Sequence, residues 1–349
     1  MSSSFVKFDE ERLKKYKKAG YRIVGKNKHT GVEICRWTKS ALRNKRRCYK
    51  QIYGVYAEYC LQCSPSLDFC NFSCEWCWRS FGKDRFKSEG KWDRPEILID
   101  EMIKAQKNLI SGFGGNEKTN RSVWEKANDP AHVAISLDGE PCLYPYLPEL
   151  VKQLKERKKT VFIVSNGTLP QMIKRLIDEN AEPTNIYISV YATNEGDYKK
   201  FTHSFIPKPL ERVKESLRLF KKFKEARTVF RMTLVKDLNL KDAKGYSELI
   251  KISQPHFVEL KGYSHLGESK FRLKRENMPS LNELEDFAKQ IAKESGYIIK
   301  ARDKVSRVII LVKDDETWEW SLKKIEEQNM MLGRIDDLNY LKCEGVIDF

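Results

Sequence analysis

The residues best suited to chemistry are three closely spaced cysteines in the segment CNFSCEWC. Cys70, Cys74 and Cys77 follow a C-x3-C-x2-C spacing. Such a loop places three thiolates within reach of one cubane iron–sulfur cluster and leaves the fourth iron without a protein ligand. A structural zinc site needs four closed ligands and usually has paired C-x2-C motifs, so the x3 gap fits zinc poorly. The spacing predicts a redox-active [4Fe-4S] cluster with one open iron.

This motif resembles that of radical S-adenosylmethionine (SAM) enzymes, in which the amino and carboxylate groups of SAM fill the open position. An electron from the cluster then breaks the sulfonium C–S bond and releases a 5′-deoxyadenosyl radical. Trp76 matches the aromatic position that lies against the adenine in this superfamily. Two later motifs follow strand-like segments, where a barrel would need them. They supply the candidate SAM-binding residues Gly139, Glu140 and Pro141 of DGEP, and Ser165 and Asn166 of SNGT.

The elements that position these motifs alternate between helical and strand-like segments from about residue 95 onward. This alternation is typical of a parallel α/β architecture. The segment LQCSPSLDF before Cys70 is the first candidate strand. The others are rich in β-branched or aromatic residues and span 132–137, 160–165, 185–191, 228–235 and 256–262. We therefore predict an incomplete (βα)6 TIM-like barrel.

The remaining segments suggest how the chain is divided. Val213, Leu217 and Phe220 recur at the spacing of one helix face and are expected in the core. Residues 114–130 lack apolar periodicity and are predicted to form an inserted loop or lid. A final helix is expected after Leu281, followed by two strands. We divide the chain into a cysteine-bearing N-terminal extension (1–60), a barrel core with C-terminal strands (61–312) and a charged tail (313–349).

Composition points to a polyanionic partner. Lys and Arg total 65 against 49 Asp and Glu, a formal excess of 16 positive charges. A heat-adapted surface would explain abundant charge of both signs but not this imbalance, so we expect a nucleic-acid partner. The nine cysteines, in a chain without a recognisable export signal, favour metal ligation over disulfides. With no apolar run of about 18 residues, the chain is expected to be soluble and cytoplasmic, without a membrane partner.

The wider sequence resembles the archaeal-type tRNA 4-demethylwyosine synthases, radical SAM enzymes of wybutosine biosynthesis. The segments that carry the resemblance are CRWTKSAL, CYKQIYG, CLQCSPSLDFCNFSCEWCWR, RMTLVKDLN, VELKGYSHLGESKFRL and SRVIILV. The resemblance implies a second [4Fe-4S] cluster, whose ligands match Cys35, Cys48 and Cys60. From spacing alone these would be buried or free thiols. Cys63 competes with Cys60 as ligand, but the distance from Cys60 to Cys70 agrees better with the family pattern.

The resemblance also implies a reaction. The family condenses pyruvate with the N1-methylguanosine beside the anticodon of phenylalanine tRNA, and the pyruvate carboxylate is lost as the third ring of the tricyclic base forms. Lys50 occupies the position proposed to form a Schiff base with pyruvate, and the alternative is pyruvate held by the open iron of the second cluster. Because the flavodoxin-like domain of eukaryotic relatives is lacking, we expect a separate flavodoxin- or ferredoxin-like electron donor.

Several residues are candidates for binding RNA. The basic runs are Lys14 to Lys18, Arg43 to Arg47 (with Arg43, Arg46 and Arg47) and Lys155 to Lys159, and each could be only a solvated helix face. Tyr263 and His265, after the sixth strand, are expected to point toward a pocket for the splayed target base. Cys142 and Cys343 match no ligand position.

Two alternative functions remain open. A radical SAM RNA methylthiotransferase or methylase would share CNFSCEWC but not CYKQIYG or KGYSHLGES. A zinc-containing RNA-binding module without enzymatic activity would lack iron altogether.

Overall fold

A single twisted sheet forms the centre of the computed structural model, which describes residues 10–80 and 91–333. Within these residues ten strands pair in the order β1-β2-β3-β4-β5-β6-β7-β8-β10-β9. Strands β3 to β8 are parallel, and antiparallel pairs extend both edges. The strands are β1 (Arg22–Val24), β2 (Thr30–Glu33), β3 (Cys60–Ser64), β4 (His132–Ile135), β5 (Thr160–Ser165), β6 (Asn185–Val190), β7 (Arg227–Leu234), β8 (Phe257–Gly262), β9 (Ile298–Asp303) and β10 (Val308–Val312).

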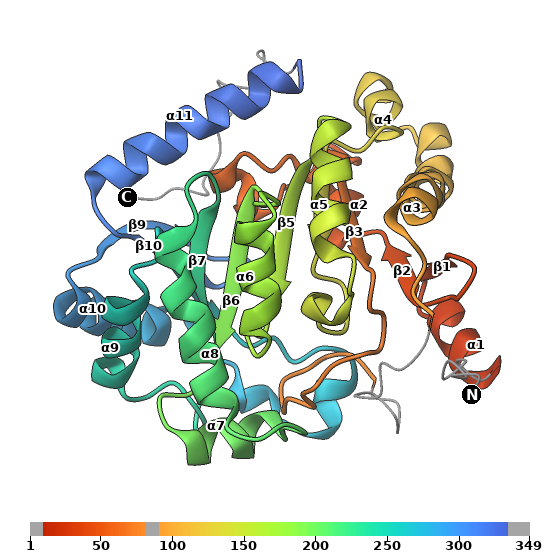
Figure 1. Cartoon of the computed structure of the whole chain (residues 1–349). Coiled ribbons are helices and arrows are strands. Elements are labelled where there is room, and N and C mark those ends of the chain that lie inside the picture. Colours follow the sequence, from red (N-terminus) through yellow and green to blue (C-terminus); the bar gives the residue numbers. More distant parts are fainter. Residues whose placement is uncertain (1–9, 81–90, 334–349) are drawn as a thin grey trace.

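Helices connect the parallel strands and cover the outer face of the sheet (Figure 1). Helices α3, α5, α6, α8, α9 and α10 follow β3 to β8 in turn, which confirms the predicted incomplete (βα)6 barrel. The helices are α1 (Glu10–Lys18), α2 (Arg36–Ala41), α3 (Pro95–Ile110), α4 (Arg121–Ala127), α5 (Leu147–Glu156), α6 (Pro170–Asp178), α7 (Glu195–Thr202), α8 (Pro209–Arg218), α9 (Ala243–Ser253), α10 (Leu281–Ser295) and α11 (Asp315–Met331).

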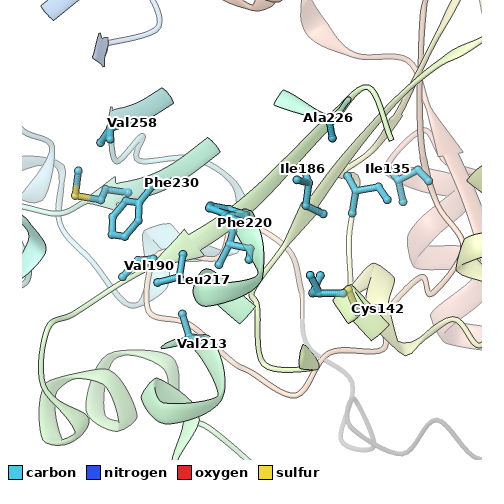
Figure 2. Packing of buried hydrophobic residues seen from close by; sticks show 14 of the residues in the cluster. Ile135, Cys142, Ile186, Val190, Val213, Leu217, Phe220, Ala226, Phe230 and Val258 are labelled. Carbon is cyan, nitrogen blue, oxygen red and sulfur yellow. The ribbon is translucent and has the colours of Figure 1, made fainter. Parts of the chain in front are cut away.

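Alternate residues of each parallel strand point to two different cores. In β5, Val161 and Ile163 belong to the core between sheet and helices, whereas Phe162 packs inside the barrel. This alternation follows from the two-residue period of a strand, and burial on both faces explains why the strands read as nearly continuous apolar runs. Figure 2 shows the outer core, where Val213 and Leu217 of α8 pack against the strands as predicted.

The segment from Ile34 to Tyr59 does not form another strand–helix unit. Its middle part, residues 49–55, packs inside the barrel, whereas its two ends pack in a separate cluster with Ile110 and Ala127. It contains α2 and two short 3-10 helices, η1 (Tyr49–Tyr53) and η2 (Ala57–Tyr59). Tyr53 of η1 makes edge-on ring contacts with Tyr187 of β6 and Phe257 of β8. The N-terminal segment therefore supplies side chains to the barrel interior.

Part of the predicted loop and part of the charged tail are helical. Within 114–130, α4 begins after Asn120, whose side chain accepts a hydrogen bond from the Val123 amide. The loop prediction is therefore wrong over α4, because this helix needs only a short apolar face against Ile110 and its neighbours. The expected charged tail contains α11, and Arg227 at the start of β7 donates to Ser321 of α11 at 2.8 Å. Residues 334–349, including Cys343, lie outside the described residues.

Within residues 10–80 and 91–333, no helix combines the length and the apolar character needed to cross a bilayer.

Candidate active site

A cavity of about 580 Å3 inside the barrel collects most of the residues singled out in the sequence. This volume suits a small-molecule site. Its lining includes Cys70, Cys74, Cys77, Trp76, Gly139, Glu140, Pro141, Ser165, Asn166, Cys35, Cys48, Lys50, Cys60 and Tyr263. The two cysteine triads and the candidate SAM-binding motifs therefore share one cavity.

The loop that carries the first triad is held by backbone and amide hydrogen bonds. The Cys77 amide donates to the Cys74 carbonyl at 3.0 Å, which gives the loop a tight turn. Asn166, at the end of β5, lies 3.8 Å from the Cys70 sulfur through Nδ2 and donates to Asn71 Oδ1 at 2.6 Å. The thiols thus lie at the carboxyl end of the barrel, where a three-cysteine cluster loop of this class is expected.

Glu140 connects the DGEP and SNGT motifs. Its carboxylate accepts hydrogen bonds from the Ser165 hydroxyl at 2.7 Å and from the Asn166 amide at 2.7 Å. Burial raises the pKa of Glu140, and these hydrogen bonds partly oppose that shift. The preceding Gly139 has φ +72°, and a Cβ atom there would collide with the Ser66 carbonyl. Glycine thus lets the DGEP turn approach the start of the cluster loop.

Trp76 lies on the same side of the cavity. Its ring is packed at 4.9 Å, centroid to centroid, from Tyr191, just beyond β6. Packed on Tyr191, Trp76 offers an aromatic surface to the same cavity that Glu140 and Ser165 line. This group of side chains has the donor, acceptor and aromatic character needed to hold SAM next to a cluster.

The second triad comes from three separate elements. Cys35 precedes α2, Cys48 precedes η1 and Cys60 begins β3. Burial raises the pKa of Cys60 well above its usual value, and the neighbouring Cys35 and Cys48 raise it further. Cys60 packs with the inner core, whereas Cys63 is fully buried in the outer core and does not line the cavity. Side chains alternate between the two faces of a strand, so Cys60 and Cys63, three residues apart, face opposite sides of the sheet.

Neither triad is arranged around a single point. Among residues 10–80 and 91–333, no three His, Cys, Asp or Glu side chains are close enough together to hold one metal ion. A cubane binds each thiolate through a different iron, so it requires thiols spread around a volume rather than converging on one atom. A closed zinc site needs four ligands, whereas each triad supplies three thiols, which is the number that a cubane with one open iron requires.

Lys50 extends from η1 into the cavity. Its Nζ lies 4.4 Å from the ring centroid of Tyr187, over the aromatic face. Burial lowers the pKa of Lys50, and the nearby Arg231 guanidinium lowers it further. Both effects favour the neutral amine, which is the form that attacks carbonyl carbon.

Three charged strand residues near Lys50 were not identified from the sequence. Arg231 of β7 and Glu259 of β8 are register partners and form a 2.6 Å ion pair inside the barrel. Lys261, two residues further along β8, also lines the cavity, and burial together with Arg231 lowers its pKa to about 8. The sequence feature that could have identified them is charge at alternate positions of otherwise apolar strands. This spacing places Glu259 and Lys261 on one face of β8.

The candidate RNA-binding residues are only partly brought to this site. Tyr263 lines the cavity and bonds Ser269 Oγ at 2.9 Å. His265 does not line it, because its Nε2 forms a 3.0 Å hydrogen bond with the Leu273 carbonyl, so the expectation that it points into the pocket is wrong.

The Arg43 to Arg47 run lies away from the cavity wall. Arg46 pairs with Asp303 of β9 at 2.7 Å, and Arg47 pairs with the buried Glu58 at 2.5 Å. Arg43 is exposed and lies over the Phe113 ring. Much of the charge in this run is therefore balanced within the protein.

Comparisons with known proteins agree with the geometry. Residues 64–250 match the family model described as the radical SAM superfamily, so the barrel and its cluster loop define a radical SAM enzyme, which uses SAM and a [4Fe-4S] cluster. Residues 252–313 match the model described as wyosine base formation. The chain belongs to the S-adenosyl-L-methionine-dependent tRNA 4-demethylwyosine synthase family.

The relatives and solved structures cover most of the chain. The synthase from Pyrococcus abyssi is 40% identical over 311 residues, which are 88% of this chain and 90% of that protein. The Methanocaldococcus jannaschii synthase is 35% identical over 86% of this chain and 96% of its own length. A structure described as TYW1 with a lysine–pyruvate adduct bound has a TM-score of 0.79 at 34% identity, and the match covers 88% of this chain and 97% of that one.

Proposed function

We propose that this enzyme forms 4-demethylwyosine in phenylalanine tRNA by condensing pyruvate with the N1-methylguanosine beside the anticodon. The observation that carries the proposal is a single cavity lined by both the cluster loop, through Cys70, and a half-buried lysine, Lys50. Radical generation and capture of a carbonyl substrate need groups of these two kinds within reach of one reacting nucleoside.

In this proposal Lys50 binds pyruvate covalently. Its amine attacks the ketone carbon, water leaves, and an imine joins the lysine to the three-carbon acid. Arg231, whose charge is paired with Glu259, and Lys261 line the same cavity and offer N–H donors that suit the pyruvate carboxylate. The adduct described for the similar TYW1 structure supports this role for a lysine. Pyruvate held only by the open iron of a second cluster is the alternative, and Lys50 substitution distinguishes the two.

The cofactors are assigned to the two triads. Cys70, Cys74 and Cys77 hold the cluster that, with bound SAM, supplies the 5′-deoxyadenosyl radical. Trp76, Gly139, Glu140, Pro141, Ser165 and Asn166 bind and orient SAM. A second [4Fe-4S] cluster is bound by Cys35, Cys48 and Cys60. We favour Cys60 over Cys63 because the Cys63 side chain belongs to the outer core.

Three further expectations stay predictions. They are a separate flavodoxin- or ferredoxin-like electron donor, a cytoplasmic location, and the division of the chain at residues 60 and 312.

The proposal is tested by assaying the product directly. Anaerobically reconstituted protein is incubated with phenylalanine tRNA carrying N1-methylguanosine, SAM, dithionite and pyruvate, and the digested nucleosides are analysed by mass spectrometry. We expect the tricyclic base in the complete reaction and not when pyruvate or the guanosine methyl group is omitted. A methylated or methylthiolated nucleoside would instead favour the other radical SAM reactions. A colourless, zinc-loaded protein would favour the RNA-binding module.

A further inference from the structure

Exposed apolar side chains lie in the cavity lining and in the segment after β8 that is bonded to the cluster loop. Phe271 is 83% exposed, the highest value for a large hydrophobic side chain among the described residues. Trp78 and Leu266 are 45% and 46% exposed, and both line the cavity. Phe271 does not line it but lies in the same short segment as Leu266. Single exposed apolar residues are common, but several gathered beside one cavity indicate a binding surface.

These side chains are held together because the segment after β8 is attached to the cluster loop. The Glu268 amide donates to the Trp78 carbonyl at 3.0 Å, and Arg272 donates to the carbonyls of Glu75 and Cys77. Gly267 permits this approach, since a Cβ atom there would collide with the Trp78 carbonyl. Trp78, whose ring has the Arg79 guanidinium over one face at 3.3 Å, and Phe271 thus belong to segments that are bonded to each other. Stacking of a base on Trp78 uses the other face of the indole.

This surface is also basic. Residues 266–275, LGESKFRLKR, contain four basic residues against one acidic residue. The acidic one, Glu268, lies 3.8 Å from Lys15 of α1, so it is already opposed by a lysine. Within residues 10–80 and 91–333, the exposed Lys270, Lys274 and Arg275 have no ion-pair partner. Unbalanced positive charge beside exposed aromatic rings is the combination found where single-stranded nucleic acid binds.

We infer that this surface, the cavity rim, binds the unpaired anticodon-loop nucleotides that flank the target guanosine. The rim comprises Trp78, Leu266, Lys270, Phe271, Lys274 and Arg275. Bases stack on Trp78 and Phe271, and phosphates contact Lys270, Lys274 and Arg275. The inference rests on the proposed function and specifies how its RNA substrate is held.

The position of the rim favours RNA over an acidic electron-donor protein. The target base has to leave its stack and pass this entrance to reach the cavity, so its neighbours remain at the entrance and need aromatic surfaces there. The α1 helix extends the positive surface, because Lys14, Lys17 and Lys18 are exposed next to the Lys15–Glu268 contact. A docking site for a protein would not require the aromatic rings to border the cavity.

The first test measures binding of phenylalanine tRNA carrying N1-methylguanosine to the reconstituted enzyme. Phe271→Ala should raise the dissociation constant on the order of 5- to 150-fold, the loss expected for one stacked base. Phe271→Tyr keeps the aromatic face and should bind nearly as well as the wild type. Met330→Ala, which truncates an exposed side chain on α11, is the matched control and should leave binding unchanged. Equal iron content confirms that the variants are folded.

The second test separates charge from stacking by varying the salt concentration. The triple variant Lys270→Gln, Lys274→Gln, Arg275→Gln should reduce the slope of log affinity against log salt by roughly 2, about 0.7 for each lost phosphate contact with a single strand. Phe271→Ala should lower affinity with little change in this slope. Lys323→Gln, on α11 and away from the rim, should change the slope less than the triple variant.

Two results would overturn the inference. One is Phe271→Ala binding tRNA as tightly as Met330→Ala does. The other is normal tRNA binding combined with slower reduction by flavodoxin but not by dithionite, which would make the rim a donor-docking surface. If wild-type enzyme forms the tricyclic base in either case, the proposed function stands and only the assignment of the rim fails.

Discussion

The two cysteine triads differ in how the chain brings them together. Cys70, Cys74 and Cys77 lie in one short loop, so local spacing alone is enough to place their thiols around a cluster. Cys35, Cys48 and Cys60 come from the N-cap of α2, the residue before η1 and the start of β3. Only the folded barrel brings them to one cavity. A site formed by residues close together in the sequence can be predicted from the sequence alone, whereas a site formed only by the tertiary structure cannot.

The surroundings of the triads differ as well. The first triad is next to hydrogen-bonded turns, in which Glu140 and Asn166 orient backbone amides and side chains. The second is next to buried charge, with Lys50 close by and the Arg231–Glu259 ion pair behind it. The first environment is suited to holding SAM, and the second to holding a small anionic substrate.

The strongest test of this difference is substitution of Lys50. Lys50→Ala should reduce tricyclic-base formation on the order of 100-fold or more, because the nucleophile is lost, while SAM cleavage and iron content remain. Lys50→Arg should fail equally, since arginine keeps the charge but not the nucleophile. Lys323→Ala, which removes an exposed lysine of α11, is the control. Borohydride with labelled pyruvate should mark the wild type and not Lys50→Ala. Normal turnover by Lys50→Ala would assign pyruvate to the second cluster instead.

The next test compares the metal content of the triads. Replacing all three cysteines of either triad with alanine should leave about half of the wild-type iron and sulfide after reconstitution, since each triad is expected to hold one four-iron cluster. Cys63→Ala should retain nearly all of it, because Cys63 faces the outer core. If removing the second triad costs no iron, the two-cluster assignment is wrong. If Cys63→Ala loses iron and Cys60→Ala does not, then Cys63 and not Cys60 is the third ligand of the second cluster.

The smallest expected effect concerns stability around the second triad. Glu259→Gln removes the carboxylate that balances Arg231 inside the barrel, and we expect a loss of about 3–5 kcal/mol in the free energy of unfolding. Glu285→Gln breaks a more exposed 3.1 Å pair with Arg302 and should cost less than about 1 kcal/mol. Anaerobic chemical denaturation measures both. Equal losses would mean that the inner charges are not buried as the barrel suggests.

Much of the fold could be predicted because each element has its own pattern. Strand β5 begins and ends at the predicted residues 160 and 165, and the stripe of Val213 and Leu217 packs as expected. Helix α4 was missed because seven residues are too few to show a clear apolar period. Its Asn120 cap was the available signal.

The candidate site was predictable only in part, for a different reason. Lys50 and the second triad were identified through resemblance, since their separation along the chain shows no chemistry by itself. Arg231, Glu259 and Lys261 were missed because charge within a strand is usually solvent-facing on one side of a sheet. A parallel barrel has no such side, so charge on an inner face indicates a functional interior.

The attachment of residues 266–272 to the cluster loop has a thermodynamic consequence. Arg272 and the Glu268 amide hold the backbone carbonyls of the loop that carries Cys74 and Cys77. Binding of a molecule that shifts Phe271 therefore affects the same hydrogen-bonded unit as reduction of a cluster held by Cys74 and Cys77 would. Such linkage is reciprocal: if binding at the entrance changes the ease of reduction by some factor, reduction must change the binding affinity by the same factor. Arrival of the RNA and arrival of the electron would then be coupled events, each making the other more or less favourable to an equal extent.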